Sequence, residues 1–234
     1  MAVVGAATDG LAKVAARRPP GPGTEAAPPL PLEAAPETLF ECLAVAAEHK
    51  DNETGRHNRR IGLYAKVVAN ALGWSRERQA VIEIAATLHD IGKIGIPDNI
   101  LFKPGDLTEA EKLVMQRHTT IGYTILSAAR DPLLACAASI AQYHHEQWCG
   151  GGYPHGLTGR DIPVEARVTT ICDVYDALRS ERPYKSPLSH QDALAIILTG
   201  DGRTHTSHFD PEMLAVMPDV EASFERIFAV MTGT

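Results

Sequence analysis

The pattern of apolar and polar residues changes near residue 37 of the chain. Residues 1–36 are dominated by Ala, Pro and Gly, as in RRPPGPGTEAAPPLPLEAAP. Such a composition buries too little apolar area to offset the entropy lost on ordering. From Glu37 onwards apolar residues return at helical spacing, first in LFECLAVAAEHK. We therefore expect a disordered tail or linker over 1–36 and one folded domain over 37–234.

The rest of the chain reads as a series of amphipathic helices. Residues that favour helix starts, such as Ser75 and the Thr108/Glu111 capping box, precede several apolar stripes. No stretch shows sustained period-two alternation, so the predicted fold class is all-α, a helical bundle. The expected helices run from about Arg76 to Asp90, from Thr108 through His118 towards Ala129, from Pro132 to about His145, from Pro163 through Asp173, from Asp192 to Leu198, and, as two short helices, from Pro211 and from Val220.

One loop stands out by its length. About twenty residues, EQWCGGGYPHGLTGRDIP, separate the helix that ends near His145 from the one that opens at Pro163. Structureless connections of this length are uncommon in compact domains and are often functional. We expect this loop to take part in the site.

Composition narrows the function classes. With 234 residues, of which 44% are hydrophobic, the chain can bury one sizeable core. A net charge of -7 offers no basic surface for duplex nucleic acid. No apolar run approaches the roughly 20 residues of a membrane span, and the start of the chain lacks a signal-peptide pattern. The four cysteines have unrelated spacings, which favours reduced thiols over disulfides. We expect a soluble cytoplasmic protein.

Candidate metal ligands interrupt the apolar helices. His89 and Asp90 are adjacent at the end of a helix whose face is otherwise apolar. A lone histidine in such a place is more often a hydrogen-bonded core residue than a ligand. Asp173 lies among mostly apolar neighbours in VTTICDVYDAL, where a carboxylate is costly unless it is paired or coordinated. His89 and Asp90 alone would prove little, and the metal interpretation depends on the further histidines.

Five further residues extend this set. Glu53 and His57 are four apart, which places them on one helix face if the segment is helical. His144 and His145 end an apolar helix, and His118 fits either a ligand or a capped surface imidazole. Eight nitrogen and oxygen donors exceed the needs of one four-coordinate zinc. We therefore predict two or three divalent ions, with iron or manganese favoured over structural zinc.

Such a site predicts hydrolysis at phosphorus. Two ions about 3.5–4 Å apart activate a water molecule and hold a phosphoryl group. Lys93, close after His89, fits a residue whose ammonium stabilises charge on that phosphate, and a surface lysine in a turn fits the sequence equally well. Arg182 and Lys185 form a second basic spot.

Three motifs carry a resemblance to a known family. LHDIGKIGIPDNILFKPGDLT, HHEQWCGGGYPHGLTGRDIP and DVYDALRSERPYK occur in this order within residues of about 37 to 215. They resemble the HD-GYP family, the branch of the HD phosphohydrolases that degrades cyclic di-GMP. The resemblance implies a helical bundle of the HD type, with linear pGpG and then GMP as products. It implies catalytic roles for His89, Asp90 and Lys93, nucleotide contacts from Tyr153, Arg182 and Lys185, and metal ligation by Glu53, His57, His89, Asp90, His118, His144, His145 and Asp173, with Asp90 as the bridge.

The chain departs from the family pattern inside the long loop. Gln147 and Cys149 stand where family members usually have Arg and Asp. For Cys149 we favour a small packed thiol over a redox-sensitive residue. Two other functions stay open: hydrolysis of a related cyclic dinucleotide such as cyclic GMP-AMP, and a non-catalytic module that binds a cyclic dinucleotide. A homodimer and a signalling-protein partner also stay open.

Overall fold

A computed structural model describes residues 36–50, 54–128, 130–181 and 187–233. The chain divides into two compact units, Met1–Leu43 and Ala44–Thr234. Of the first unit, only the start of helix α2 (Pro36–Lys50) is described. Within the described ranges the second unit contains helices, turns and one isolated β-bridge, between Cys149 and Thr158, so the all-α prediction is confirmed. No helix in these ranges is long and apolar enough to cross a membrane.

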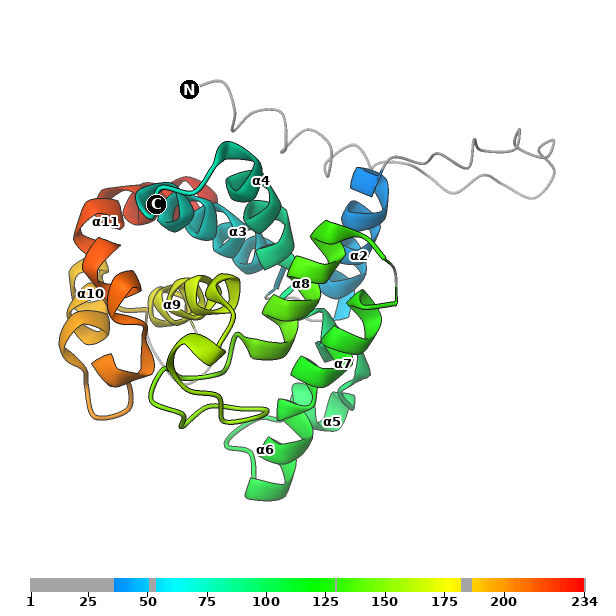
Figure 1. Cartoon of the computed structure of the whole chain (residues 1–234). Coiled ribbons are helices and arrows are strands. Elements are labelled where there is room, and N and C mark those ends of the chain that lie inside the picture. Colours follow the sequence, from blue (N-terminus) through cyan, green and yellow to red (C-terminus); the bar gives the residue numbers. More distant parts are fainter. Residues whose placement is uncertain (1–35, 51–53, 129, 182–186, 234) are drawn as a thin grey trace. The chain divides into compact units, whose positions relative to one another are not determined.

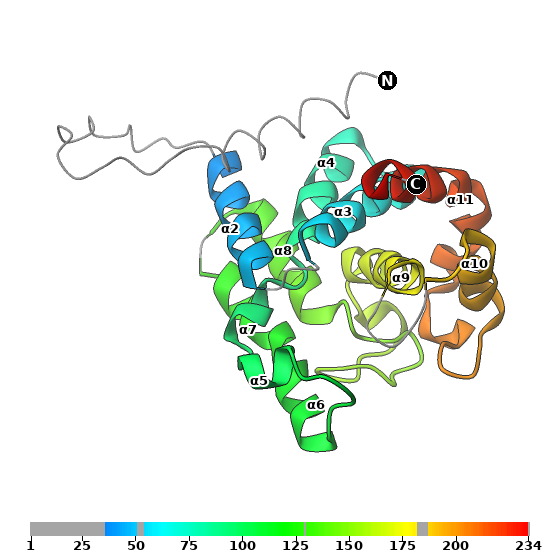
Figure 2. The same cartoon turned by 180° about the vertical axis from the view of Figure 1, so that it is seen from behind.

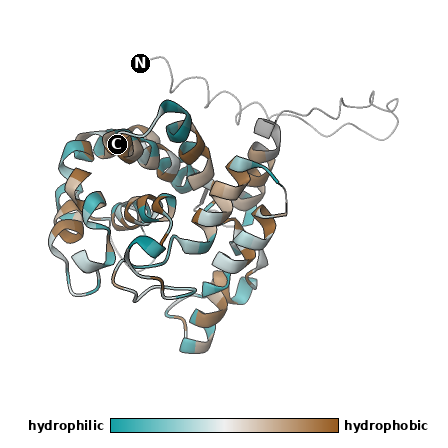
Figure 3. Cartoon of the chain, viewed as in Figure 1, coloured by the Kyte–Doolittle hydropathy of each residue, from teal (hydrophilic) through white to brown (hydrophobic). Residues whose placement is uncertain are grey.

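The second unit is built around helix α9 (Val164–Arg179), which packs against other helices of this unit and lies between them in both views (Figures 1 and 2). Apolar and polar segments alternate along the helices of this unit (Figure 3), as expected for helices that bury one face. The main helices besides α9 are α3 (Thr54–Ala71), α4 (Arg76–Ala85), α5 (Asp98–Leu101), α6 (Glu109–Gln116), α7 (His118–Leu126), α8 (Pro132–Tyr143), α10 (His190–Thr199) and α11 (Pro211–Thr232).

Three buried aromatic residues join α3, α9 and α11. The ring of Tyr64 stacks on Phe224 with centroids 4.4 Å apart, and Tyr175 meets both rings edge-on at 5.4 and 5.0 Å. All three side chains are fully buried. Such pairs contribute about 0.5–1.5 kcal/mol each beyond the burial of their area. This cluster fixes α3 against α9, the two helices that carry His57 and Asp173.

The helix expected from Arg76 to Asp90 ends earlier than predicted. Ser75 caps it as expected, accepting a hydrogen bond from the Arg78 backbone at 3.3 Å. Regular α-helix stops at Ala85 and tightens into the 3-10 turn η1 (Ala86–Leu88). A second 3-10 turn, η2 (Ile91–Gly95), then changes the chain direction. His89 and Asp90 therefore lie at the junction of the two turns.

The helix expected from Thr108 towards Ala129 is two helices. The predicted capping box of Thr108 and Glu111 is present at the start of α6. The helix breaks at Arg117, and α7 begins at His118. None of the residues of α6 is buried, whereas α7 packs against η2 and α8. The break lets α6 lie in solvent while His118, at the start of α7, enters the interior.

The prediction of two short C-terminal helices is wrong. A single helix, α11, runs through Pro218. A proline inside a helix costs roughly 3 kcal/mol or more. One continuous buried stripe at three- and four-residue spacing offsets this cost on both sides of the proline. The stripe consists of Met213, Met217, Val220, Phe224 and Phe228.

Candidate metal centre

The structure brings together the described residues that the sequence analysis selected as metal ligands. They come from separate elements: His57 from α3, the His89–Asp90 pair from the η1–η2 junction, and Asp173 from α9. His118 opens α7, His144 is the residue that caps the end of α8, and His145 follows it. Three elements thus place histidines at their ends, where the chain can bend towards a common point.

Asp90 lies at the centre of this cluster. Its Oδ1 atom is 3.3 Å from Nε2 of His118 and 3.7 Å from Nε2 of His144. Its Oδ2 atom is 3.4 Å from Nε2 of His89 and 2.8 Å from the Lys93 ammonium. The two oxygens of one carboxylate therefore face two different sets of side chains.

Asp173 closes the side of the cluster that faces α3. Its Oδ1 atom is 3.3 Å from Nε2 of His57 and 4.0 Å from Nε2 of His89. Two groups of donors result, each with its ligand atoms within 4.8 Å of one another, and Asp90 belongs to both. One group is Asp90, His118, His144 and His145, and the other is His57, His89 and Asp90.

The histidines are oriented by hydrogen bonds at Nδ1. His89 contacts the Ala86 carbonyl at 3.0 Å, and His118 contacts the Met115 carbonyl at 2.8 Å. His144 likewise faces two carbonyls of α8, both at 3.1 Å. A carbonyl only accepts, so Nδ1 must carry the proton in each ring. Nε2 then presents a lone pair, as a metal-binding imidazole requires.

Those lone pairs point at a carboxylate instead of at a donor. Nε2 of His89 and Oδ1 of Asp90 are buried and form no hydrogen bond, although neighbouring acceptors lie within 4 Å. Buried polar atoms normally have a partner. Acceptors that converge on one point repel one another unless a cation lies between them. The donor set therefore fits divalent metal ions.

The electrostatics of the two carboxylates agree with this fit. Burial alone would raise the pKa of Asp90, but Lys93 and His89 outweigh it and hold the pKa well below its usual value. At Asp173 burial is likewise outweighed, chiefly by the hydrogen bond with His57, so its pKa is also lowered. Both carboxylates are ionised at neutral pH, the form that binds metals.

The histidines divide into two classes. Burial, supplemented by neighbouring histidines, lowers the pKa of His118 to about 4 and also lowers the pKa of His145, so both rings are neutral. At His57 burial also acts to lower the pKa, but hydrogen bonds to Asp173 and Asp176 raise it to about 9. The position between these two carboxylates stabilises positive charge, which a metal ion would supply in place of the ring proton, because a ligand histidine must be neutral.

Two residues that orient His57 were missed by the sequence analysis. Asp176 is fully buried, and its Oδ2 atom accepts a hydrogen bond from Nδ1 of His57 at 2.7 Å. Arg60 donates to both oxygens of Asp176, at 2.6 and 2.7 Å. Carboxylates that fix the ring of a ligand histidine in this way raise its basicity. The available signal was spacing: Asp176 is three residues after Asp173, and Arg60 three after His57, hence on the same helix faces.

The long loop packs against the cluster. The ring of Tyr153 stacks on His145 with centroids 4.7 Å apart. The buried Glu146 carboxylate accepts hydrogen bonds from the backbone of His155 at 2.8 Å and of Leu157 at 3.0 Å. The expectation of a packed thiol at Cys149 is wrong, because this residue is exposed. The bridge with Thr158 holds the Cys149 backbone, and the thiol makes an exposed contact with the Gln147 side-chain oxygen at 3.9 Å instead of packing in the core.

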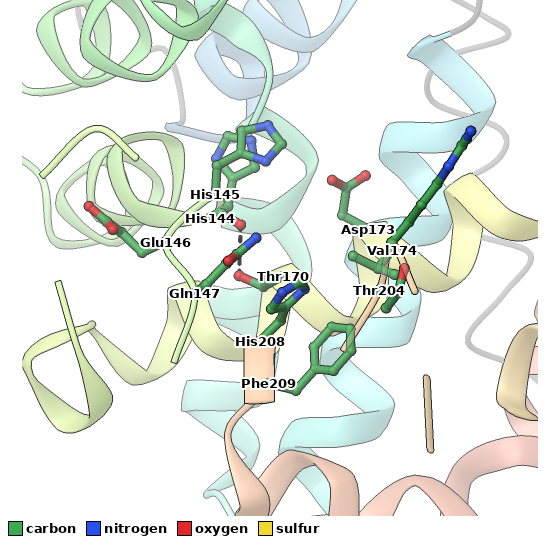
Figure 4. A pocket seen from close by; sticks show the side chains of 11 residues that line it. His144, His145, Glu146, Gln147, Thr170, Asp173, Val174, Thr204, His208 and Phe209 are labelled. Carbon is green, nitrogen blue, oxygen red and sulfur yellow. Dashed lines mark hydrogen bonds between the residues drawn. The ribbon is translucent and has the colours of Figure 1, made fainter. Parts of the chain in front are cut away.

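A pocket of about 210 Å³ opens beside the cluster. Figure 4 shows His144 and His145 on one side of it, Asp173 across from them, and Thr204, His208 and Phe209 along another wall. Thr170 fixes this arrangement by donating a hydrogen bond to the His144 carbonyl at 2.7 Å. The full lining is His144, His145, Glu146, Gln147, Thr170, Asp173, Val174, Arg203, Thr204, His208 and Phe209. The wall from 203 to 209 was not foreseen from the sequence.

Some predicted site residues lie outside the described part of the chain. These are Glu53, Arg182 and Lys185. Lys93 is described: its ammonium is 2.8 Å from Asp90, which places it at the cluster.

Comparison with known proteins shows which family the chain belongs to. A family model described as HD domain matches residues 41–213. The chain belongs to the HD domain family. The chain is 45% identical, over 82% of its own length and 49% of the relative, to the cyclic di-GMP phosphodiesterase response regulator RpfG of Xanthomonas campestris pv. campestris. It is 40% identical to the 3'3'-cGAMP-specific phosphodiesterase 2 of Vibrio cholerae, over 75% of this chain and 33% of that protein.

A solved structure confirms the HD fold. The cyclic GMP-AMP specific phosphodiesterase V-cGAP3 of Vibrio cholerae superposes with a TM-score of 0.58 at 18% identity, covering 82% of this chain and 50% of that one. The chain spans about half the length of the first curated relatives that it matches.

Proposed function

We propose that this HD domain is a metal-dependent phosphodiesterase that hydrolyses cyclic di-GMP to linear pGpG and further to GMP. The observation that carries the proposal is the position of Asp90. Its Oδ1 atom faces Nε2 of His118 and of His144 and is buried without a hydrogen bond, whereas its Oδ2 atom faces Nε2 of His89 and the Lys93 ammonium. Relatives that are 40% and 45% identical to this chain are named cyclic di-GMP phosphodiesterases.

The proposed metal ligands are the clustered residues, with Asp90 shared between two ions. Divalent ions held there, iron or manganese in this proposal, would supply Lewis-acid charge and an activated water. The sequence resemblance adds Glu53 as a ligand for a third ion. The other proposed ligands are His57, His89, His118, His144, His145 and Asp173.

Side chains around the cluster have separate proposed tasks. Lys93, held at Asp90, directs its ammonium to the phosphate that is cleaved and stabilises the charge that develops there. Asp176 keeps Nε2 of His57 turned inward through its hydrogen bond to Nδ1. Tyr153 keeps the ring of His145 in place by stacking on it. In this proposal Arg182 and Lys185 contact the nucleotide, and 37–234 is the catalytic domain that follows a tail over 1–36.

A second candidate substrate is 3'3'-cGAMP, because one relative is named as specific for it. A third possibility from another class is a domain that binds a cyclic dinucleotide without turnover. The resemblance to the first relatives favours cyclic di-GMP as the substrate.

The test is to purify the protein without oxygen, measure metals per chain by elemental analysis, and follow each cyclic dinucleotide by chromatography with added iron(II) or manganese. Two or more ions per chain and formation of pGpG support the proposal. Asp90→Ala should lose metal, whereas Lys93→Ala should keep metal and lose turnover. Metal at full content with no turnover of any cyclic dinucleotide would refute the phosphodiesterase.

A further inference from the structure

The loop between α10 and α11 forms one wall of the pocket. Arg203, Thr204 and His208 line it together with His144, His145 and Asp173 of the candidate metal centre. The loop is joined to the long loop by a hydrogen bond from the Trp148 backbone to the His208 carbonyl at 2.8 Å. If a phosphate of the substrate lay at the metal centre, the nucleoside attached to it would therefore lie next to this wall.

A closed turn presents Arg203 to the pocket. The Asp201 carboxylate accepts hydrogen bonds from the backbone of Arg203 at 3.0 Å and of Thr204 at 2.8 Å. The Asp201 backbone in turn donates to the Thr204 carbonyl at 3.0 Å. The backbone at Arg203 is thus fixed. Its guanidinium, in contrast, makes no hydrogen bond or ion pair with any residue that the structure describes, and the residue is exposed.

The lining suits a nucleobase better than a second phosphate. Phosphate sites collect several cationic donors, but Arg203 is the one Lys or Arg among the described lining residues. Two carboxylates, of Glu146 and Asp173, also line the pocket. Apart from the proposed metal ligands, the remaining side chains are the amide of Gln147, the hydroxyls of Thr170 and Thr204, the imidazole of His208 and the apolar Val174 and Phe209, which match the edge and the face of a base. At about 210 Å³ the pocket is also smaller than the roughly 300–1,000 Å³ that encloses a drug-sized ligand, so it would take only part of a dinucleotide.

We propose that Arg203 recognises a guanine base of the substrate through its O6 and N7 atoms. The planar guanidinium offers two parallel donors, and guanine presents two adjacent acceptors there, whereas adenine replaces O6 with a donor amine. Arg203 is thereby a specificity-determining residue that selects guanine in the nucleoside next to the cleaved phosphate. This inference rests on the proposed function for its substrate class, but its binding test does not depend on turnover.

Binding is measured first, by calorimetry in proteins that also carry Lys93→Ala so that the substrate is not hydrolysed, with cyclic di-GMP and cyclic di-AMP on the otherwise wild-type chain, Arg203→Ala, Arg203→Lys and Arg203→Gln. Wild type should prefer cyclic di-GMP. Arg203→Ala should weaken cyclic di-GMP binding roughly 5- to 150-fold, the factor that corresponds to about 1–3 kcal/mol per bidentate pair, and leave cyclic di-AMP binding unchanged. Lysine keeps the positive charge but lacks the two parallel donors of the guanidinium, so Arg203→Lys should not restore the preference for cyclic di-GMP. The matched control is Arg226→Ala, an exposed arginine of α11 that does not line the pocket.

The second measurement uses cyclic GMP-AMP, whose two phosphodiester bonds are inequivalent. A base held in the pocket fixes which bond meets the metal centre, so wild type should give mainly one of the linear products pGpA and pApG. Arg203→Ala should give a mixture of both. This ratio is internal to one substrate and is independent of the overall rate.

The outcomes separate the two proposals. Equal losses of cyclic di-GMP and cyclic di-AMP binding would show a general charge effect and overturn guanine recognition, as would unchanged binding or a wild type without preference. The protein could also bind cyclic di-GMP in preference to cyclic di-AMP, lose this preference in Arg203→Ala, and hydrolyse no cyclic dinucleotide. That result would support guanine recognition by Arg203 and refute the proposed phosphodiesterase activity.

Discussion

The buried pair of Asp176 and Arg60 allows a quantitative test of how the centre is held. Asp176 is fully buried and the Arg60 side chain is 6% exposed. Replacing Asp176 with Asn keeps the shape but removes the charge, which leaves the guanidinium uncompensated. Breaking a buried pair from one side costs about 3–5 kcal/mol, a large part of the about 5–15 kcal/mol that stabilises a typical domain. Asp176→Asn should therefore unfold at much lower urea in metal-free protein.

The same substitution should weaken metal binding for a different reason. Nδ1 of His57 loses its anionic partner at 2.7 Å, so the ring is less basic and less well oriented. Substitution of such orienting groups typically costs 10–100-fold in metal affinity or activity. We expect this loss in a competitive titration with a chromophoric chelator at 10 °C, where the variant is most folded. Asp219→Asn, an exposed position of α11, is the matched control and should change neither quantity.

A double variant separates the two effects. Replacing both members of a buried pair with apolar residues is often neutral or stabilising. Arg60→Met combined with Asp176→Leu should therefore regain most of the lost stability in urea while metal affinity stays 10–100-fold low. Recovery of metal affinity together with stability would refute the positioning role, and an unchanged urea midpoint for Asp176→Asn would refute the energetic argument.

Three further predictions concern neighbouring segments. Gly92→Ala would place a Cβ atom 1.9 Å from the His118 carbonyl oxygen, so η2 must move off α7; we expect a loss near the upper end of the about 1–3 kcal/mol typical of overpacking, and a wild-type urea midpoint would contradict this. Glu146→Gln replaces one of the two oxygens that accept hydrogen bonds from the loop backbone. Hydrogen exchange of the loop amides, measured by mass spectrometry, should rise about tenfold or more for one lost charged hydrogen bond, and turnover should fall. Unchanged exchange would contradict the role of Glu146 in ordering the loop. Cys149→Ser should change the free energy of unfolding by less than about 0.5 kcal/mol, because the thiol is exposed, and thiol alkylation should leave turnover intact; inactivation by alkylation would show a functional thiol.

Much of the local structure followed from residues close together in the chain. Helix starts at Ser75, at the Thr108/Glu111 box and at Pro132 were predictable because capping depends on hydrogen bonds within three residues. The all-α class followed from the helical spacing of apolar residues. The candidate ligands were recognisable because an ionisable group within an apolar stripe is costly to bury unless it is paired or binds a metal ion.

Tertiary packing decided where the helices end and which groups meet. The break at Arg117 and the continuous α11 through Pro218 depend on which faces are buried, and burial is a property of the assembled core. The link from Asp176 to Arg60 spans 116 residues, and the wall with Arg203 reaches the centre only through the packing of α9, α10 and α11. The sequence by itself determined which residues are able to bind metals and where most helices begin, because those properties are local. Only the fold decided that the two oxygens of Asp90 face different histidines, since that geometry requires elements distant in sequence to converge on one carboxylate.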